Sequence, residues 1–532
     1  MRHQGAKVLA CAAALAGAWT AMPDEAAAFC GFYVSGADGG MYNDATMVVL
    51  MRDGVRTVLA MKNTYKGPPQ DFAMVVPVPV VLREGDVKTL PAEIFRRVDT
   101  LAAPRLVEYW EQDPCYVEPE IYYLQGSDIT EDSPVVRRSK ERPRDLGVTI
   151  EAQFAVGEYQ IVILGANDSV GLDLWLRQNG YKIPEGAAAV LRPYVAAGMK
   201  FFVAKVDIDK APFGSHGGRE LSPLRFHYDS ETFSLPVRLG LINTQGEQDL
   251  IVHILARETR YELANYRNVA IPTNLDVKAE TAGQFASFYA ALFDRTIGDG
   301  AAAVVTEYAW AAGSCDPCPE PPLTLAELVT LGADVLPSYE KALRGKKVPS
   351  TMTYEVPGQF VLTRLHSRYG PSNLGEDLVF QAAPPIQGGS GTPYAEQVLS
   401  REAVASGANA FQARYIIRHP WTGPVTCERP QYGKWGPPPR GSAPSMQVGR
   451  DLAFAARDEP LTEFLAEKTE PQALTMPAGP ISLPAPQAYQ VNEDDVPRSR
   501  GCGRCDAVGG SGWPGLLVVL GLRRRRRSRT QA

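Results

Sequence analysis

Two cysteines separated by two residues are the strongest chemical signal in this sequence. The segment 315–318 reads Cys-Asp-Pro-Cys, the spacing of a thiol redox centre in which a lowered thiolate pKa makes an oxidant or isomerase. The motif precedes Pro319 in a proline-rich loop, whereas a thioredoxin-like motif opens a helix after a strand. A structural disulfide is therefore favoured, either between Cys315 and Cys318 or from one of them to Cys427.

The other cysteines leave the disulfide pairing open. Between the two ends of the chain, the candidate disulfide cysteines are Cys30, Cys115, Cys315, Cys318 and Cys427. Two disulfides and one leftover thiol allow about fifteen arrangements. A structural zinc site needs four thiolates or imidazoles together, and an oxidising compartment disfavours reduced cysteines. No metal and no cofactor is predicted.

Two histidines provide a weaker hint of chemistry. His227 and His253 alternate within predicted strands and could face one another, with Asp229 nearby, as an acid/base or metal site would require. Ordinary strand histidines satisfied by hydrogen bonds are the favoured interpretation. The sequence has no G-x-S-x-G, H-E-x-x-H or phosphate-loop motif, and the G-x-G-x-x-A match at 298–303 follows a predicted helix instead of a strand. No catalytic residue is assigned.

The first 28 residues have the pattern of a secretory signal peptide. Arg2 and Lys7 form a basic start, and residues 8–22 are apolar or small. Ala26 and Ala28 then form an A-x-A cleavage site before Phe29. We expect signal peptidase to remove this segment.

The last 32 residues form a second targeting signal. Gly501 and Cys502 are followed by a small-residue spacer, an apolar run over 513–522 and an arginine cluster at 523–527. Ten residues make a helix of about 15 Å, half the thickness of a hydrocarbon core, so this short transmembrane segment is suited to removal. Clustered arginines stay on the cytoplasmic side, which places the rest of the chain outside the cytoplasm.

This order of features resembles the MYXO-CTERM sorting tail of myxobacteria and their relatives. The resemblance implies that a membrane protease cleaves at Gly501-Cys502 and that the product is displayed on the cell surface, at the outer membrane. The membrane is then a partner only before processing. Whether Cys502 is lipidated stays open.

Charge and proline content divide the chain between these signals. The signal peptide carries two basic and two acidic residues, and the tail carries seven arginines against Asp506, which leaves a net charge of −12 on the body. An acidic body argues against nucleic acid as a partner. Residues 430–500 hold twelve prolines, which predicts a stalk after a core over 29–429.

The core predicts an α+β fold dominated by antiparallel sheets in a sandwich-like arrangement. Strands over 47–52 and 55–61 flank Asp53-Gly54, a pair that favours a hairpin turn. A third strand is predicted over 71–79, and its prolines indicate an edge strand or the end of a strand. Helices are predicted over 92–110 (interrupted near Pro104), 170–178, 187–197, 279–292 and 325–336, and further strands over 147–164, 201–206, 222–228, 233–242, 249–255, 360–367, 377–381 and 413–418.

Several of these blocks are similar to the bacterial "domain of unknown function 2330" family. They are the segments 71–79, 221–225, 315–319 and 360–365, scattered over a region from about residue 30 to 423. The resemblance implies an exported protein without an assigned activity, and it transfers no catalytic residue.

Two hypotheses of function follow. The favoured one is a surface-anchored binding or structural module of the envelope, whose ligand is unknown, with recognition through aromatic loops such as 432–435. The alternative is an exported enzyme, either a hydrolase at a pocket containing His227 and His253 or a thiol oxidoreductase at Cys315 and Cys318. A reduction potential below about −300 mV for that pair would mark a structural bond.

Overall fold

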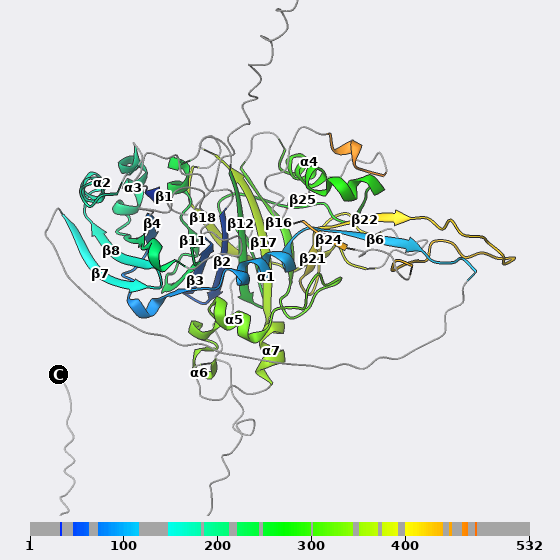
Figure 1. Cartoon of the computed structure of the whole chain (residues 1–532), viewed down its shortest axis with the longest axis horizontal. Coiled ribbons are helices and arrows are strands. Elements are labelled where there is room, and N and C mark those ends of the chain that lie inside the picture. The colour runs from blue at the N-terminus through cyan, green and yellow to red at the C-terminus, as the bar shows by residue number, and fades with distance from the viewer. Residues whose placement is uncertain are drawn as a thin grey trace, which may run out of the picture. The chain divides into compact units, whose positions relative to one another are not determined.

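Strands of four sheets form the centre of the molecule, and most of the helices lie on the outer faces (Figure 1). The computed structural model describes residues 32–34, 46–62, 73–115, 147–181, 183, 186–211, 221–243, 248–298, 302–343, 351–370, 375–391, 399–439, 446–449, 460–466 and 474–475. All structural statements below concern these residues.

The central sheet has twelve strands. Its main path runs through β20 (Val404–Ala405), β19 (Ile386–Gly388), β21 (Ala410–Gln412), β16 (Ala303–Ala311), β17 (Phe360–Tyr369), β12 (Gln248–Arg257), β2 (Thr46–Asp53), β3 (Arg56–Lys62), β10 (Leu224–Asp229) and β5 (Val87–Thr89). Beside this path, β14 (Arg267–Ala270) pairs with β16, and β25 (Leu474–Thr475) pairs with β14. Most neighbours are antiparallel, but β12 and β2 are parallel.

Three smaller sheets surround the central one. A five-stranded sheet consists of β1 (Phe32–Val34), β4 (Ala73–Val78), β9 (Lys200–Val206), β8 (Tyr159–Ala166) and β7 (Val148–Val156). A three-stranded sheet contains β11 (Ser234–Leu235), β18 (Leu378–Ala383) and β13 (Arg260–Leu263). The last contains β15 (Leu275–Asp276), β22 (Arg414–His419), β6 (Arg105–Glu111), β23 (Trp435–Gly436) and β24 (Met446–Val448).

The helices are short. The α-helices are α1 (Glu93–Ala102), α2 (Ser169–Gln178), α3 (Ala187–Ala196), α4 (Phe285–Ile297), α5 (Leu325–Leu331), α6 (Glu340–Leu343) and α7 (Met352–Gln359). The 3-10 helices are η1 (Glu84–Asp86), η2 (Ile208–Lys210), η3 (Arg238–Asn243), η4 (Ala279–Gln284), η5 (Ala333–Val335) and η7 (Leu461–Glu463).

Hydrophobic clusters on both faces of two packed sheets create four layers. Leu59 of β3 and Phe202 of β9 belong to the cluster between the central and the first five-stranded sheet. Trp175 and other side chains of α2 and α3 cover the outer face of the five-stranded sheet. α1, α5, α6 and α7 cover the outer face of the central sheet, where Met51 is buried. This sandwich of sheets with helices outside confirms the predicted α+β class, and its sheets are mainly antiparallel as expected.

The first hairpin has the predicted position. β2 and β3 pair directly, with Asp53 opposite Arg56, and Gly54 adopts a φ of 59°, in the left-handed region. Glycine reaches this region without a steric penalty, which is why the Asp-Gly pair was informative.

One prediction near this hairpin was wrong. The helix expected over 92–110 ends at Ala102, and the chain continues through Pro104 as strand β6. For the strand predicted over 71–79, the prolines mark an ending: β4 lies between β1 and β9 and ends at Val78, between Pro77 and Pro79.

Part of the proline-rich segment 430–500 packs against the core. β23 and β24 both pair with β6, and β25 pairs with β14. Phe464 and Leu465 are 2% and 5% exposed, and they belong to the same hydrophobic cluster as α4. The described residues of this segment are therefore not a free stalk; residues 476–500 lie outside the described part of the chain.

Candidate functional site: a buried charge network and a disulfide loop

Strand β17 carries three basic side chains into the protein interior. Arg364, His366 and Arg368 alternate along the strand, so all three point to the same face of the central sheet. Their exposed fractions are only 2%, 3% and 4%. Charged groups buried this deeply require partners that satisfy both charge and hydrogen bonding.

The main partner is Glu307 of β16. The β16–β17 register shifts between Thr306 and Tyr308, so Glu307 is the extra residue of a β-bulge. A bulge re-aims the side chain it carries. The two carboxylate oxygens of Glu307 lie 2.7 Å from Nδ1 of His366 and 2.5 Å from Nε of Arg364.

Further carboxylates complete the network from β12 and from the helices. Asp249 of β12 lies 3.1 Å from Nε2 of His366 and accepts from Nε of Arg368 at 2.8 Å. Arg364 also donates to Asp99 of α1, and Arg368 also donates to Asp294 of α4. The network thereby connects three adjacent strands with helices above them.

Aromatic side chains of α4 close the network from one side. The phenol of Tyr289 donates a hydrogen bond to Glu307. The centroid of the Phe293 ring lies 4.0 Å from the centroid of the His366 imidazole. The same centroid lies 4.9 Å from the guanidinium carbon of Arg368. These contacts exclude water and give both cations an aromatic neighbour.

The pKa shifts define the charge states. Burial alone would raise the pKa of Glu307, but the charges of His366 and Arg364 outweigh it and lower this pKa to about 2. Burial would lower the pKa of His366, but Glu307 and Asp249 outweigh it and raise this pKa above its ordinary value. Glu307 is therefore a carboxylate, and His366 is favoured as an imidazolium.

His253, the other histidine of the network, is neutral, whereas His366 is favoured as an imidazolium. Nε2 of His253 lies 3.5 Å from Nη1 of Arg364. Since arginine can only donate, Nε2 of His253 must accept, and the imidazole is neutral. Burial and the positive charge of Arg364 both lower the pKa of His253, in agreement with this tautomer.

The network has the residue types of an acid/base triad but a saturated geometry. Both ring nitrogens of His366 already contact carboxylates, and both oxygens of Glu307 already accept hydrogen bonds. No lone pair of His366 is available to take a proton from a substrate. The arrangement stabilises the fold by joining β12, β16 and β17 to α1 and α4.

His227 and His253 do not face one another, so the acid/base or metal site that their spacing allowed is not formed. Both histidines lie on the same face of the central sheet, but His227 is on β10 and His253 is on β12, with β2 and β3 between them. His227 instead lies 3.6 Å from Asp86, and Asp229 pairs with Arg56 at 2.5 Å. Strand alternation gives the face of a side chain but not the order of the strands, so the spacing in the sequence could not decide whether the two histidines meet.

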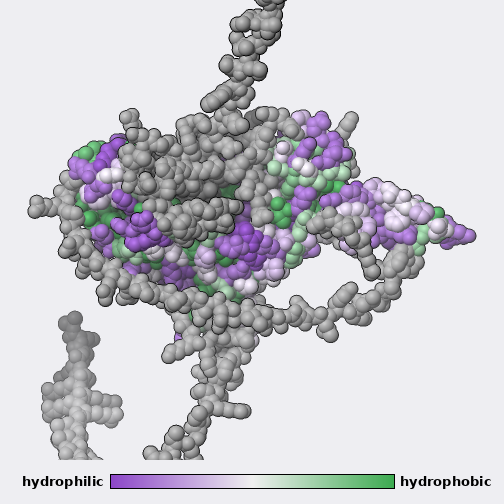
Figure 2. All heavy atoms as spheres, viewed as in Figure 1, coloured by the Kyte–Doolittle hydropathy of each residue, from purple (hydrophilic) through white to green (hydrophobic). Residues whose placement is uncertain are grey.

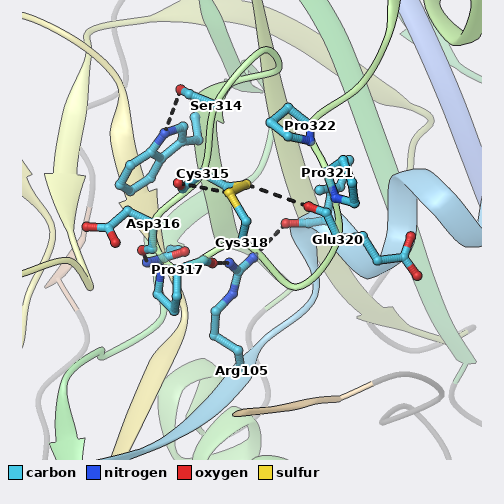
Figure 3. Close-up of a disulfide and its surroundings, with 12 residues drawn as sticks. Arg105, Ser314, Cys315, Asp316, Pro317, Cys318, Glu320, Pro321 and Pro322 are labelled. Carbon is cyan, nitrogen blue, oxygen red and sulfur yellow. Dashed lines mark hydrogen bonds between the residues drawn. A yellow bond between two sulfur atoms is a disulfide. The ribbon is translucent and has the colours of Figure 1, made fainter. Parts of the chain in front are cut away.

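The Cys-Asp-Pro-Cys segment forms a closed loop after β16 (Figure 3). A disulfide joins Cys315 to Cys318, the local pairing that was one of the two predicted structural options. Figure 3 shows Arg105 reaching the loop from β6, where its Nη1 donates to the Pro317 carbonyl at 2.6 Å. The guanidinium of Arg105 is fully buried, and this burial lowers its pKa.

A second disulfide joins Cys115 to Cys427, which are 312 residues apart. It connects the chain after β6 with the chain after β22 at the projecting end of their sheet (Figure 1). Aromatic groups accompany it: Trp110 stacks on His419 with 4.5 Å between ring centroids, and Tyr432 is 52% exposed. On the face seen in Figure 2, this projection is mainly hydrophilic or neutral, with a small hydrophobic area near its tip.

The remaining predicted site residues lie outside the described part of the chain. These are Ala26, Ala28, Cys30, Gly501 and Cys502, together with the apolar segment 513–522. Among the residues that the structure describes, no helix is long and apolar enough to cross a bilayer. The same residues contain no group of three or more metal-ligating side chains placed to hold an ion.

Sequence reasoning missed Glu307, Arg364 and His366 as a group. The strand over 360–367 was predicted, and the basic residues at alternate positions 364, 366 and 368, at its end, were a readable sign of a buried ionic site. The strand containing Glu307 was not predicted. A single acid within the apolar run 303–312 was the signal that could have located its partner.

Comparison with known proteins identifies a family but no activity. No curated protein and no solved structure matches this chain. A family model described as "Uncharacterized protein conserved in bacteria (DUF2330)" matches residues 24–381. That range contains β2 to β17, both cysteines of the 315–318 loop and all the charged groups of the buried network. The chain therefore belongs to the DUF2330 family of bacterial proteins, as the residue blocks in its sequence indicated.

Proposed function

We propose that this protein is exported, anchored at the cell surface, and acts there as a binding or structural module of the envelope. The observation that carries the proposal is the Cys115–Cys427 disulfide, which joins distant parts of the chain. Disulfides of this kind form and persist in oxidising compartments. The signal peptide over 1–28 and the sorting tail over 501–532 support the same destination.

Binding is favoured over hydrolysis by the state of the buried polar groups. His366 and Glu307 are saturated by their partners, and His227 and His253 are separated by two strands. A binding module instead needs accessible aromatic side chains on a rigid support. The projection formed by β6, β22 and β23 offers Tyr432 and Trp435, the latter with the Arg418 guanidinium 5.3 Å from its ring.

Protease treatment of intact cells tests the location. We expect external protease to digest the protein on whole cells while a cytoplasmic marker stays intact. A Cys502→Ala variant should accumulate with its arginine cluster attached and should resist the protease, because it is not sorted. Equal protection of the wild-type protein and the cytoplasmic marker would contradict surface display.

Pull-down of purified envelope fractions tests the binding role. The wild-type protein should retain envelope material, and Tyr432→Ala should weaken retention at least fivefold, corresponding to about 1 kcal/mol for an exposed aromatic anchor. Val404→Ala is the matched control, since Val404 is exposed on the distant strand β20. If the Tyr432→Ala protein retains as much envelope material as the wild-type protein, this projection is not the binding surface.

A further inference from the structure

The Cys315–Cys318 disulfide has one accessible and one sheltered end. Cys318 is exposed, whereas Cys315 is half-buried and packs against the hydrophobic cluster beneath α1 and α5. A thiolate arriving from solvent therefore meets the sulfur of Cys318 first and leaves Cys315 as the departing thiolate. The other disulfide lacks this asymmetry, because Cys115 and Cys427 are both half-buried.

Side chains from distant elements hold the loop without help from the disulfide. The fully buried Arg105 donates to the carbonyl of Pro317 at 2.6 Å, as Figure 3 shows. Gln412 of β21, also fully buried, donates to the carbonyl of Asp316. Both residues between the two cysteines are thus fixed through their backbone oxygens.

The two ends of the loop are fixed as well. The amide of Leu323 donates to the carbonyl of Ala312 at 3.0 Å and closes the base of the loop. Arg97 of α1 donates to the carbonyl of Pro321 at 2.8 Å. None of these hydrogen bonds involves a sulfur atom of the disulfide, so its cleavage does not remove them directly.

The same geometry offers each thiol an acceptor. The sulfur of Cys318 lies 3.1 Å from the carbonyl oxygen of Cys315, and the sulfur of Cys315 lies 3.9 Å from the carbonyl oxygen of Glu320. After reduction, each S–H group can donate weakly to its neighbouring carbonyl.

The Cys315–Cys318 disulfide is expected to stabilise the fold less than the Cys115–Cys427 disulfide. Cys315 and Cys318 are three positions apart in sequence, whereas Cys115 and Cys427 are 312 apart. The stabilisation that a disulfide gives by restricting the unfolded chain grows with the length of the loop it closes. The short disulfide therefore contributes the smaller constraint, and its reduction leaves the fold intact.

We propose that Cys315 and Cys318 form an exchange-active disulfide that oxidises dithiols of other polypeptides. This activity goes beyond the proposed binding role and does not depend on it. A substrate thiolate attacks the Cys318 sulfur, the Cys315–Cys318 bond breaks, and Cys315 leaves as a thiolate that takes up a proton. The second substrate thiolate then attacks the mixed disulfide and releases Cys318. The substrate loses two electrons and two protons to become a disulfide, and the protein pair becomes a dithiol.

Competitive reduction of the purified full-length chain is the first test. The protein is incubated with reduced glutathione, quenched with N-ethylmaleimide at intervals, and its cysteine peptides are quantified by mass spectrometry. We expect Cys315–Cys318 to open at least tenfold faster than Cys115–Cys427, while circular dichroism shows that the opened protein remains folded. Equal rates, or loss of the fold when the short disulfide opens, would overturn the proposal.

Single-cysteine variants test the direction of attack. In Cys315→Ser the remaining Cys318 should form a mixed disulfide with oxidised glutathione at least tenfold faster than Cys315 does in Cys318→Ser. Circular dichroism of both single variants is the folding control, and each variant keeps the Cys115–Cys427 disulfide. Equal reactivity of the two single variants would contradict the assigned roles.

Oxidation of a substrate completes the test. The oxidised protein is mixed with an excess of a reduced peptide that contains two cysteines, and the peptide disulfide is measured. One equivalent should form per protein chain, and none should form with the Cys315→Ser/Cys318→Ser variant. If the wild-type protein yields no peptide disulfide above that variant, the assigned activity is absent. Because the purified chain is used, this outcome is separate from export or surface binding.

Discussion

Glu307 and His366 form the centre of the buried ionic network. Each contacts more than one oppositely charged partner, and their pKa values shift in opposite directions, so both remain charged in the interior. A buried ion pair gains from its partners about what it loses by leaving water, so the net stabilisation from the intact network is small. Removing one member, however, leaves the other charges uncompensated.

Glu307→Gln is the most direct residue-level test of this network. Loss of its charge leaves His366 and Arg364 buried with too little negative charge, and we expect unfolding free energy to fall by about 3–5 kcal/mol. Chemical denaturation measures the change. Glu93→Gln is the control: the side chain of Glu93 is 63% exposed in its ion pair with Arg96, and such pairs contribute about 0–1 kcal/mol. Similar losses from both variants would contradict a special role for Glu307.

The pKa shifts also predict how stability depends on pH. His366 has a raised pKa in the folded protein, so its contribution is complete below its unfolded pKa of about 6.5 and is lost as pH rises through the raised value. Glu307 acts in the opposite direction: its contribution is present above about 4.5 and is lost as pH falls toward 2. Unfolding free energies measured across pH should decline above pH 6.5, and His366→Gln should remove that part of the decline. An unchanged alkaline slope in the variant would show that His366 is not the titrating group.

Only part of the network could be predicted from the sequence. The side chains that meet Glu307 and Arg364 come from positions as far as 265 residues away, as Asp99 does. Local spacing gives the face of a strand, so alternating Arg364, His366 and Arg368 were predictable as one set. Their partners depend on which strands become neighbours, and no local pattern contains that order.

Strand pairing brings together elements that are far apart in the sequence. The bulge in β16 aims Glu307 into the network, and β6 pairs with β22 in parallel although the two strands are about 300 residues apart in the chain. Local turn chemistry predicted the β2–β3 hairpin, because Asp53-Gly54 decides it alone. The strand after Pro104 and the docking of residues 460–466 were not predicted, since tertiary pairing decided them.

The two disulfides should differ in their effect on stability. The chain-entropy model gives about 6 kcal/mol for a loop as long as that closed by Cys115 and Cys427, and about 2 kcal/mol for the loop closed by Cys315 and Cys318. We therefore expect Cys115→Ser/Cys427→Ser to destabilise the protein more than Cys315→Ser/Cys318→Ser in denaturant titrations. The reverse order would indicate that the short disulfide is the main structural bond.

Docking of the proline-rich segment is also testable. Phe464 contacts Phe288 of α4, with 6.0 Å between ring centroids, and is nearly completely buried. Phe464→Ala should lower unfolding free energy by about 3–5 kcal/mol, as for a core aromatic residue. Tyr432→Ala, at an exposed aromatic residue, should change it by less than about 0.5 kcal/mol. A negligible effect of Phe464→Ala would mean that this segment is a stalk along its whole length.

Considered as a whole, the protein combines a four-layer core with two predicted targeting signals. The core contains four hydrophobic clusters and the ionic network around Glu307 and His366, whose carboxylate oxygens and ring nitrogens all have partners. The accessible chemistry lies at its periphery, at the Cys315–Cys318 loop and at the aromatic projection. This distribution fits a module that works by surface contacts in an oxidising compartment.

Mass spectrometry of the mature protein recovered from the cell surface tests the central claim most directly. We predict a chain that begins at Phe29 and ends at Cys502, with or without a lipid, and that contains the Cys115–Cys427 bond. A surface form that retains the arginine cluster at 523–527 would contradict sorting by the C-terminal tail. A protein found only with residues 1–28 attached would contradict export itself.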